Sequence, residues 1–188
     1  MIKIVVLDAC VLYAAHLRDF LLYLAQQKLY KPRWSDQIND EWIRNVLKNR
    51  PDLTAKSFDR VRFMMNDAFP RANVKGYSHL HKGLNLPDVG DVHVLATAIK
   101  SDADFIVTFN IKDFPSNELT KHGIEAVHPD DYLITLIEKS PVKATQAFIN
   151  QVEHLKYPPI TAAEILDKFR KTNLKNTANR LENLLLQV

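Results

Sequence analysis

Five acidic residues are spaced so that a parallel α/β fold would bring their side chains together. The chain places Asp8 at the end of an aliphatic run, Glu41 in a helical pattern, Asp88 and Asp91 at the start of another, and Asp113 after a second aliphatic run. Two like charges about 4 Å apart repel by about 4 kcal/mol at an effective dielectric of 20, so such a cluster needs protonation or a cation. A hard divalent ion with oxygen ligands meets that need and supports phosphodiester hydrolysis. The pattern therefore predicts a Mg²⁺ or Mn²⁺ centre.

Alternating strand and helix patterns predict the scaffold that positions these residues. Buried strands are expected at 2–8, 105–108 and 124–127, with a further short strand at 73–77. Helices are expected at 11–27, 52–69, 89–101 and 129–138. A further helix is expected to begin after Ser35, which can serve as its N-cap. This alternation implies an α/β fold, a parallel sheet with right-handed crossovers inside an α/β/α sandwich. Ligands bind outside the carboxyl ends of such strands, where we expect Asp8, Asn110 and Asp113.

The chain beyond residue 140 shows only helical patterns. Thr161 and Glu164 form a capping-box sequence that opens one helix. An apolar stripe on the last helix consists of Leu174, Leu181, Leu184 and Leu185. Such a stripe can pack on the rest of the chain, form a homodimer or bind a partner helix. We expect an α/β domain at 1–140 and an all-helical C-terminal extension at 141–188.

Composition sets outer limits on the function. The 188 residues include one cysteine, Cys10, which excludes an intrachain disulfide and a thiolate zinc cluster and is expected to be a small core residue. The net charge of +3 arises beyond residue 140, where seven of the 25 basic and four of the 22 acidic residues lie, and it is weak evidence for nucleic-acid binding. No segment has the pattern of a signal peptide or a membrane span. We expect a cytoplasmic protein without a membrane partner.

Several motifs, in this order and spacing, resemble the PIN domain. They are Asp8 after an aliphatic strand, Ser35 with Glu41 six residues later, the stretch DVGDVHVLATA at 88–98, and the stretch ADFIVTFNIKDFP at 103–115. The resemblance covers the nuclease-like domain at 1–140, and the helical tail resembles that of one VapC subgroup. It implies a Mg²⁺- or Mn²⁺-dependent endoribonuclease. Bacterial members are mostly VapC toxins of type II toxin–antitoxin pairs, so it also implies an RNA substrate, a small antitoxin partner and a possible homodimer.

The resemblance carries residue roles to matching positions of this chain. Asp8, Glu41 and Asp91 match the first three acidic positions of the family, as catalytic residues and metal ligands. The fourth position falls on the asparagine of Thr108-Phe109-Asn110. Asn110 is therefore the fourth catalytic candidate, whereas Asp113, three residues later, is the candidate that supplies the missing charge to the metal. The family pattern leaves one metal or two open.

Structural roles compete with functional ones at several of these positions. The spacing of Asp88 and Asp91 is also that of an N-cap and a first-turn residue, and we favour the cap for Asp88 and the metal for Asp91. Ser35 and Thr108 are candidates for binding substrate, although capping and strand roles explain them equally well. The seven histidines show no ligand spacing and are expected to be non-catalytic. The candidates for contact with RNA phosphates are Arg18, Arg33, Arg44 and Lys112.

Two other functions remain open. A phosphatase of the haloacid-dehalogenase type would use Asp8 as a covalent nucleophile, but it needs an aspartate two residues later, where this chain has Cys10. Asn110 keeps open a binding or regulatory module with a weakened site. The presence of Asp8, Glu41 and Asp91 argues against such a module.

Overall fold

Four short parallel strands form the predicted sheet, in the order β2-β1-β3-β4. The strands are β1 (Ile4–Leu7), β2 (Lys31–Arg33), β3 (Phe105–Val107) and β4 (Glu125–Val127) in a computed structural model that describes residues 1–156 and 158–187. Val6 of β1 pairs with Arg33 on one side and Ile106 on the other, and Ile106 pairs with Ala126. β1 is therefore central, and its residues 5–7 are fully buried. This confirms the predicted α/β fold.

The edge strand β2 is absent from the sequence prediction. Its three residues read Lys-Pro-Arg, which carries neither alternation nor an aliphatic run. Proline lacks an N–H donor and is tolerated on edge strands, so tertiary pairing with β1 rather than local propensity makes this strand. The strand predicted at 73–77 is wrong. Only a single bridge forms there, between Trp34 and Asn73.

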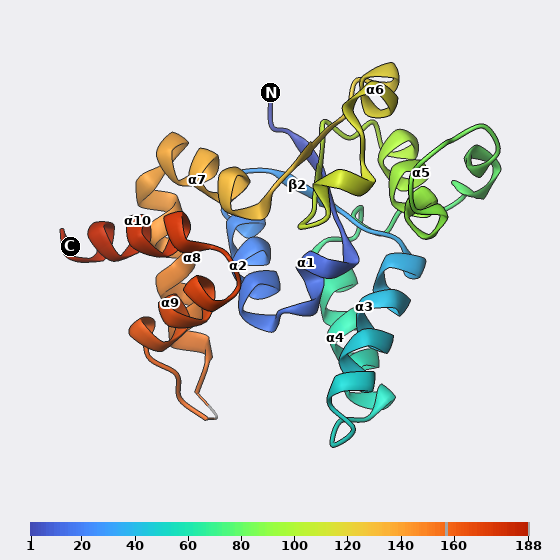
Figure 1. Ribbon diagram of the computed structural model, residues 1–188. Helices are drawn as coiled ribbons and strands as arrows, with labels where there is room; N and C mark the ends of the chain where they lie inside the picture. The colour runs from blue at the N-terminus through green and yellow to red at the C-terminus, as the bar shows by residue number, and fades with distance from the viewer. Residues whose placement is uncertain (157, 188) are drawn as a thin grey trace. The chain divides into compact units, whose positions relative to one another are not determined.

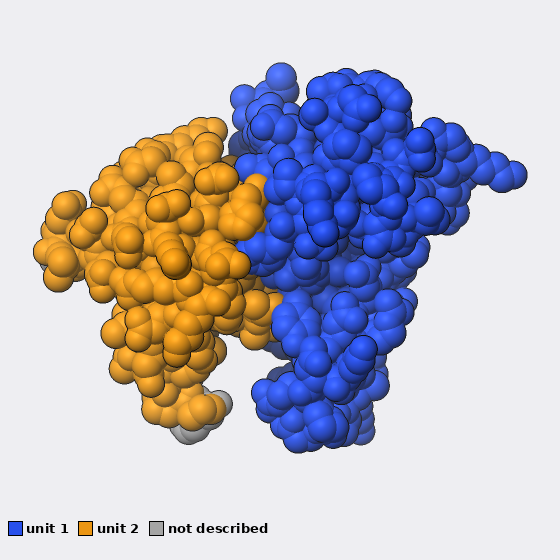
Figure 2. Space-filling model, viewed as in Figure 1, with its two compact units in different colours: residues 1–13, 31–127 blue, residues 14–30, 128–188 orange. Residues whose placement is uncertain are grey.

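The described chain divides into two compact units (Figure 2). Unit 1 comprises residues 1–13 and 31–127, and unit 2 comprises residues 14–30 and 128–188. Segment 14–30 thus clusters with the C-terminal helices, which local patterns do not reveal because the two segments are distant in sequence. A boundary near residue 140, drawn from the change of pattern alone, stays a prediction.

Unit 1 surrounds its sheet with helices and 3₁₀ turns (Figure 1). They are α1 (Ala9–Tyr13), α3 (Asp36–Asn49), α4 (Ala55–Ala68), η1 (Ser78–His81), η2 (Val89–Asp91), α5 (Val92–Lys100), η3 (Ile111–Asp113), α6 (Ser116–Leu119) and η4 (Thr120–His122). The predicted helix at 11–27 is interrupted, because Ala14 adopts an extended conformation between α1 and the next helix. The predicted N-cap at Ser35 is confirmed, since its hydroxyl accepts the N–H of Ile38 at 3.2 Å.

The helices and strands described in unit 2 are all α-helices (Figure 1): α2 (Ala15–Gln26), α7 (Pro129–Lys139), α8 (Pro141–His154), α9 (Ala162–Lys171) and α10 (Lys175–Leu185). Phe20, Phe148 and Phe169 are fully buried, with ring centroids 5.5–6.1 Å apart. The capping box at Thr161 is confirmed. Leu181 of the apolar stripe is also fully buried, in a helix that packs on α7 and α9. Among the described residues, no helix has both the length and the apolar character needed to cross a membrane.

Candidate metal centre

Asp8 lies directly beyond the carboxyl end of β1, and its carboxylate is held by three donors. The side chain is only 3% exposed. Oδ1 accepts the N–H of Ala9 at 2.6 Å, and Oδ2 accepts the hydroxyl of Thr108 at 2.7 Å and the thiol of Cys10 at 3.1 Å. Because β1 and β3 are parallel neighbours, their carboxyl ends bring Asp8 and Thr108 together. The position and orientation of this carboxylate are therefore fixed by the sheet.

Thr108 and Cys10 form the support beneath Asp8. The Thr108 hydroxyl is fully buried and also accepts the N–H of Asn110 at 3.0 Å. The Cys10 sulfur accepts the N–H of Phe109 at 3.3 Å. Burial, followed by the negative charge of Asp8, raises the pKa of the Cys10 thiol well above its usual range, so the thiol stays protonated as a donor. The sequence pattern around Cys10 indicates only a small core residue and carries no signal of this contact.

The pKa of Asp8 is raised above its ordinary value. Burial is the largest cause, because it disfavours the charged form. The hydrogen bonds from Thr108, Cys10 and Ala9 act in the opposite direction, and the nearby carboxylate of Glu41 raises the pKa further. The three hydrogen bonds therefore do not fully offset the unfavourable burial of the Asp8 negative charge.

Asp91 is the residue on which the other four carboxylates act electrostatically. Its pKa is raised to about 7, first by burial and then by repulsion from Asp8, Asp88, Glu41 and Asp113. All five carboxylates predicted from the sequence are therefore within electrostatic reach of one point. The two 3₁₀ turns position two of them, since Asp91 ends η2 immediately before α5, and Asp113 ends η3 after β3.

Glu41 reaches the cluster from α3. Its side chain is partly exposed, and Oε2 lies 3.2 Å from Nε2 of His93 on α5. His93 is 4% exposed. This contact with Glu41 is not predicted for His93, which is expected from the sequence only to be non-catalytic. Its position two residues after Asp91 is the available signal, but no pattern of residues indicates that Glu41 faces it.

The remaining candidates occupy distinct places. Asp88 accepts the N–H of Gly90 at 2.7 Å, which confirms the favoured cap, although the capped element is the 3₁₀ turn η2 rather than α5 itself. Asn110 is exposed just before η3. Ser35 is fully buried, with its hydroxyl used as the cap of α3, so the structure does not favour its prediction as a residue that contacts substrate. The same holds for Thr108, whose hydroxyl is used by Asp8.

The predicted phosphate-binding side chains differ in exposure. Arg44 and Lys112 are exposed, and Arg33 is partly buried. Burial and the nearby Arg71 lower the pKa of Arg33. Arg18 lies buried in unit 2 and pairs with Asp19 at 3.4 Å, so its guanidinium is not a free surface cation.

The chemistry of the cluster fits a hard divalent cation. All five acidic donors are carboxylate oxygens, and their mutual repulsion shows in the raised pKa of Asp91. Within the described residues, no three ligating side chains are already drawn together as a ready-made metal-binding set. Mg²⁺ usually takes one or two carboxylates and retains several waters, so it does not require such a set. The residues therefore suit a partly hydrated ion.

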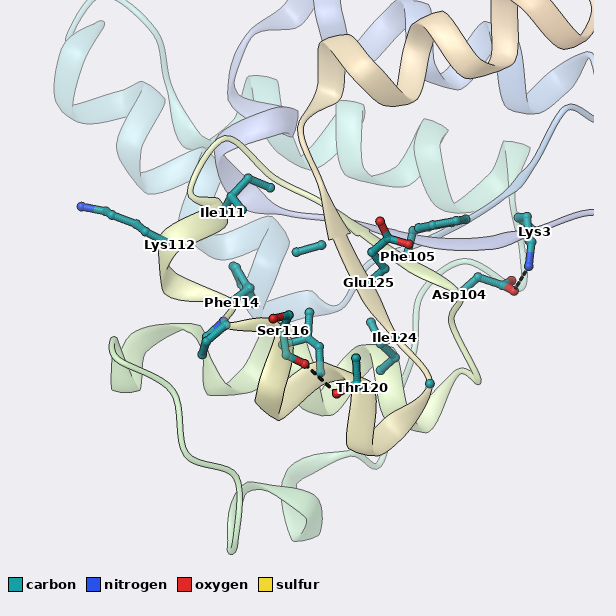
Figure 3. Close-up of a pocket in the computed structure, with 14 residues that line it drawn as sticks. Lys3, Asp104, Phe105, Ile111, Lys112, Phe114, Ser116, Thr120, Ile124 and Glu125 are labelled. Carbon is teal, nitrogen blue, oxygen red and sulfur yellow. Dashed lines mark hydrogen bonds and ion pairs between the residues drawn. The ribbon is translucent and has the colours of Figure 1, made fainter.

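A hollow of about 780 Å³ has a lining that includes none of these carboxylates (Figure 3). Its walls come from β3, β4, η3 and α6, with Phe114 and Ile124 among the apolar lining and the Lys3–Asp104 ion pair at its rim. None of the five acidic residues lines it. The candidate chemistry is therefore at the acidic cluster and not in this hollow.

The pKa of Asp91, raised by burial and by the neighbouring carboxylates, predicts a pH-dependent stability in chelator. A folded pKa of about 7 against an ordinary 3.8 means that the folded chain binds more protons than the unfolded chain between those values. The contribution of Asp91 to stability is therefore lost as the pH rises from about 4 to 7, and Asp91→Asn removes that pH-dependent contribution. Because Asp91 is half-buried and solvent screens the repulsion, we expect Asp91→Asn to be more stable by about 1–2 kcal/mol at pH 8 and equal near pH 4.

Urea unfolding in EDTA at several pH values measures this difference. Asp59→Asn is the matched control, since Asp59 is exposed on α4 and does not perturb Asp91. An equal gain from both variants at pH 8 would show that the effect is general charge and not the cluster.

Comparison with known proteins assigns both parts of the chain. Residues 4–112 match the family described as PIN domain, and residues 129–183 match the family described as VapC50 C-terminal domain. A protein of Mycobacterium tuberculosis (strain ATCC 25618 / H37Rv), named as a candidate ribonuclease, VapC50, is 35% identical over 92 residues. That match covers 49% of this chain and 54% of the relative, so about half of the relative's length is spanned. No solved structure matches the chain significantly.

Proposed function

Because the chain belongs to the PIN domain family, we propose that it is a divalent-metal-dependent endoribonuclease. The observation that carries the proposal is that Asp8, Glu41, Asp88 and Asp113 all act electrostatically on the half-buried Asp91, whose pKa is raised to about 7, first by burial and then by these four carboxylates. A binding surface for RNA has no need of such a repulsive cluster, since phosphates are themselves negative. A cation that offsets the repulsion explains why the carboxylates converge. The name of the mycobacterial relative agrees with this activity.

The side chains of the site have two proposed roles, which are to bind the metal and to position its ligands. Asp8, Glu41, Asp91 and Asp113 would hold the ion, which when bound supplies an activated water and stabilises charge on the scissile phosphate. Thr108 and the Ala9 N–H keep the Asp8 carboxylate in place. We assign Thr108 and Ser35 to positioning rather than to contact with RNA, because both hydroxyls are buried and engaged.

Asn110 has a different assignment. Its backbone N–H fixes the Thr108 hydroxyl, while its side chain is exposed beside the cluster at the start of η3. A neutral amide in this place adds no charge to the site and is free to bond to a substrate phosphate or a water. Asp113, which raises the pKa of Asp91, takes the fourth acidic role.

The biological setting follows from the family and is part of the proposal. The chain would act in the cytoplasm as the toxin of a toxin–antitoxin pair, with RNA as substrate. A small antitoxin would inhibit it by placing an arginine or lysine against the same carboxylates. One such cation would remove the repulsion at Asp91 and exclude the metal at once.

Metal removal tests the proposed activity. The purified chain should cleave a single-stranded RNA oligonucleotide in Mn²⁺ and leave it intact in EDTA, with 3′-hydroxyl and 5′-phosphate product ends. Restoration of cleavage by excess Mn²⁺ excludes damage by the chelator. Equal cleavage in EDTA would contradict the proposal. Binding of RNA without cleavage in either condition would favour a regulatory module, the alternative that Asn110 suggests.

A further inference from the structure

A buried histidine contacts the acidic cluster from outside it. Nε2 of His93 lies 3.2 Å from Oε2 of Glu41, and the two residues belong to different helices, α5 and α3. An ionised carboxylate only accepts hydrogen bonds, so Nε2 carries the proton and donates it. This bond joins α3 to the helix that begins directly after Asp91.

The second ring nitrogen of His93, Nδ1, makes no comparable hydrogen bond among the described residues. Nδ1 is buried and has no hydrogen-bond partner in the described part of the chain. An unpaired buried polar atom is unfavourable, and an aliphatic side chain would fill this place on α5 without that cost. The ring's one hydrogen bond therefore identifies the reason for a histidine here, and that bond is to Glu41.

We propose that His93 is a positioning residue for the metal centre. It fixes the Glu41 carboxylate through Oε2 and leaves Oε1 for the divalent ion. This positioning role rests on the function proposed above. A free glutamate side chain loses rotamer freedom when it is ordered, and a preformed bond removes part of that loss from the binding step. Partners of metal-ligating carboxylates typically contribute about 10- to 100-fold in metal affinity or activity.

Two amides of different length test the role. In His93→Gln the amide nitrogen falls near the place of Nε2, whereas in His93→Asn it falls near that of Nδ1 and cannot reach Glu41. We expect His93→Asn to raise the Mn²⁺ dissociation constant by about 10- to 100-fold and His93→Gln to stay within about threefold of the unmodified chain. Isothermal titration on the full chain measures the constants, and melting in EDTA measures stability. If the asparagine variant does not fold, His93→Met fills the volume without a donor, with the same expected result.

A double-mutant cycle separates positioning from general damage. On a Glu41→Gln background, His93→Asn should have no further effect on Mn²⁺ affinity, because the ligand that it orients is gone. Thr97→Val is the matched control, since Thr97 is also buried on α5 and its hydroxyl donates to the backbone carbonyl of His93, not to the His93 ring or to Glu41. It should lower stability without changing Mn²⁺ affinity.

The possible failures are distinguishable. Absence of Mn²⁺ binding by the unmodified chain would overturn the proposed function and the positioning role together. Normal binding that His93→Asn leaves unchanged would overturn the positioning role alone. Equal losses of affinity in the glutamine, asparagine and Thr97→Val variants would show that His93 acts only through the stability of α5.

Discussion

Asp8→Asn is expected to lower RNA cleavage in Mn²⁺ by at least about 100-fold, because it removes a carboxylate of the metal centre. Mutation of a residue that only contacts a metal ligand already lowers metal affinity or activity by about 10- to 100-fold, and loss of a ligand should have at least that effect. The fold should persist. The new amide retains an oxygen for the N–H of Ala9, and loss of the acceptor for Thr108 is offset by removal of a buried charge whose pKa is raised. We expect stability in EDTA to change by less than about 1 kcal/mol.

Single-turnover cleavage and urea unfolding measure the two parts of this prediction. Asp59→Asn again serves as the control, since it removes one negative charge from the exposed face of α4. Cleavage by Asp8→Asn at the rate of the unmodified chain would contradict the assignment of Asp8. A large loss of stability would instead mean that its hydrogen bonds, and not its charge, are its main contribution.

Asp130→Ala is expected to have the largest effect on stability. Asp130 on α7 is 5% exposed and accepts the N–H groups of Asn176 and Thr177 at 3.1 and 2.8 Å and the Thr177 hydroxyl at 2.6 Å. These N–H groups belong to the first turn of α10, whose own N-cap residue, Leu174, supplies no side-chain acceptor. Alanine leaves them and the fully buried Thr177 hydroxyl without this acceptor, which should cost about 2–4 kcal/mol.

Urea unfolding of the full chain, followed by helical circular dichroism, measures this cost. Asp131→Ala is the matched control on the same turn of α7, because Asp131 is exposed and its carboxylate caps no other helix among the described residues. It should change stability by about 0.5 kcal/mol or less. Asp130→Asn, which keeps one acceptor oxygen, should fall between the two. Similar effects of the two alanine variants would contradict a cap supplied by α7.

Sequence patterns predict much of the fold because the relevant signals are local. The aliphatic run before Asp8 and the run before Thr108 are strands, and the caps at Ser35 and Thr161 stand where the residue types place them. β2 could not be predicted, since a Lys-Pro-Arg strand exists only through its pairing with β1. The break at Ala14 is hidden for a similar reason, because apolar spacing continues through it.

The membership of the acidic cluster is predictable, but its supports are not. Strand ends and helix starts bring Asp8 and Asp91 to one place, as the topology of parallel sheets requires. The contacts of Cys10 with Asp8 and of His93 with Glu41 depend on side-chain directions across separate elements. No spacing in one sequence encodes them, so neither Cys10 nor His93 is predicted as part of the site.

The affinity of the chain for Mn²⁺ tests the central claim most directly. Isothermal titration at pH 8 should detect Mn²⁺ binding by the unmodified chain, weakened at least about tenfold in Asp8→Asn and in Asp91→Asn but unchanged in Asp59→Asn. Equal affinity in all four proteins, or none in any of them, would contradict a metal centre built on Asp8 and Asp91.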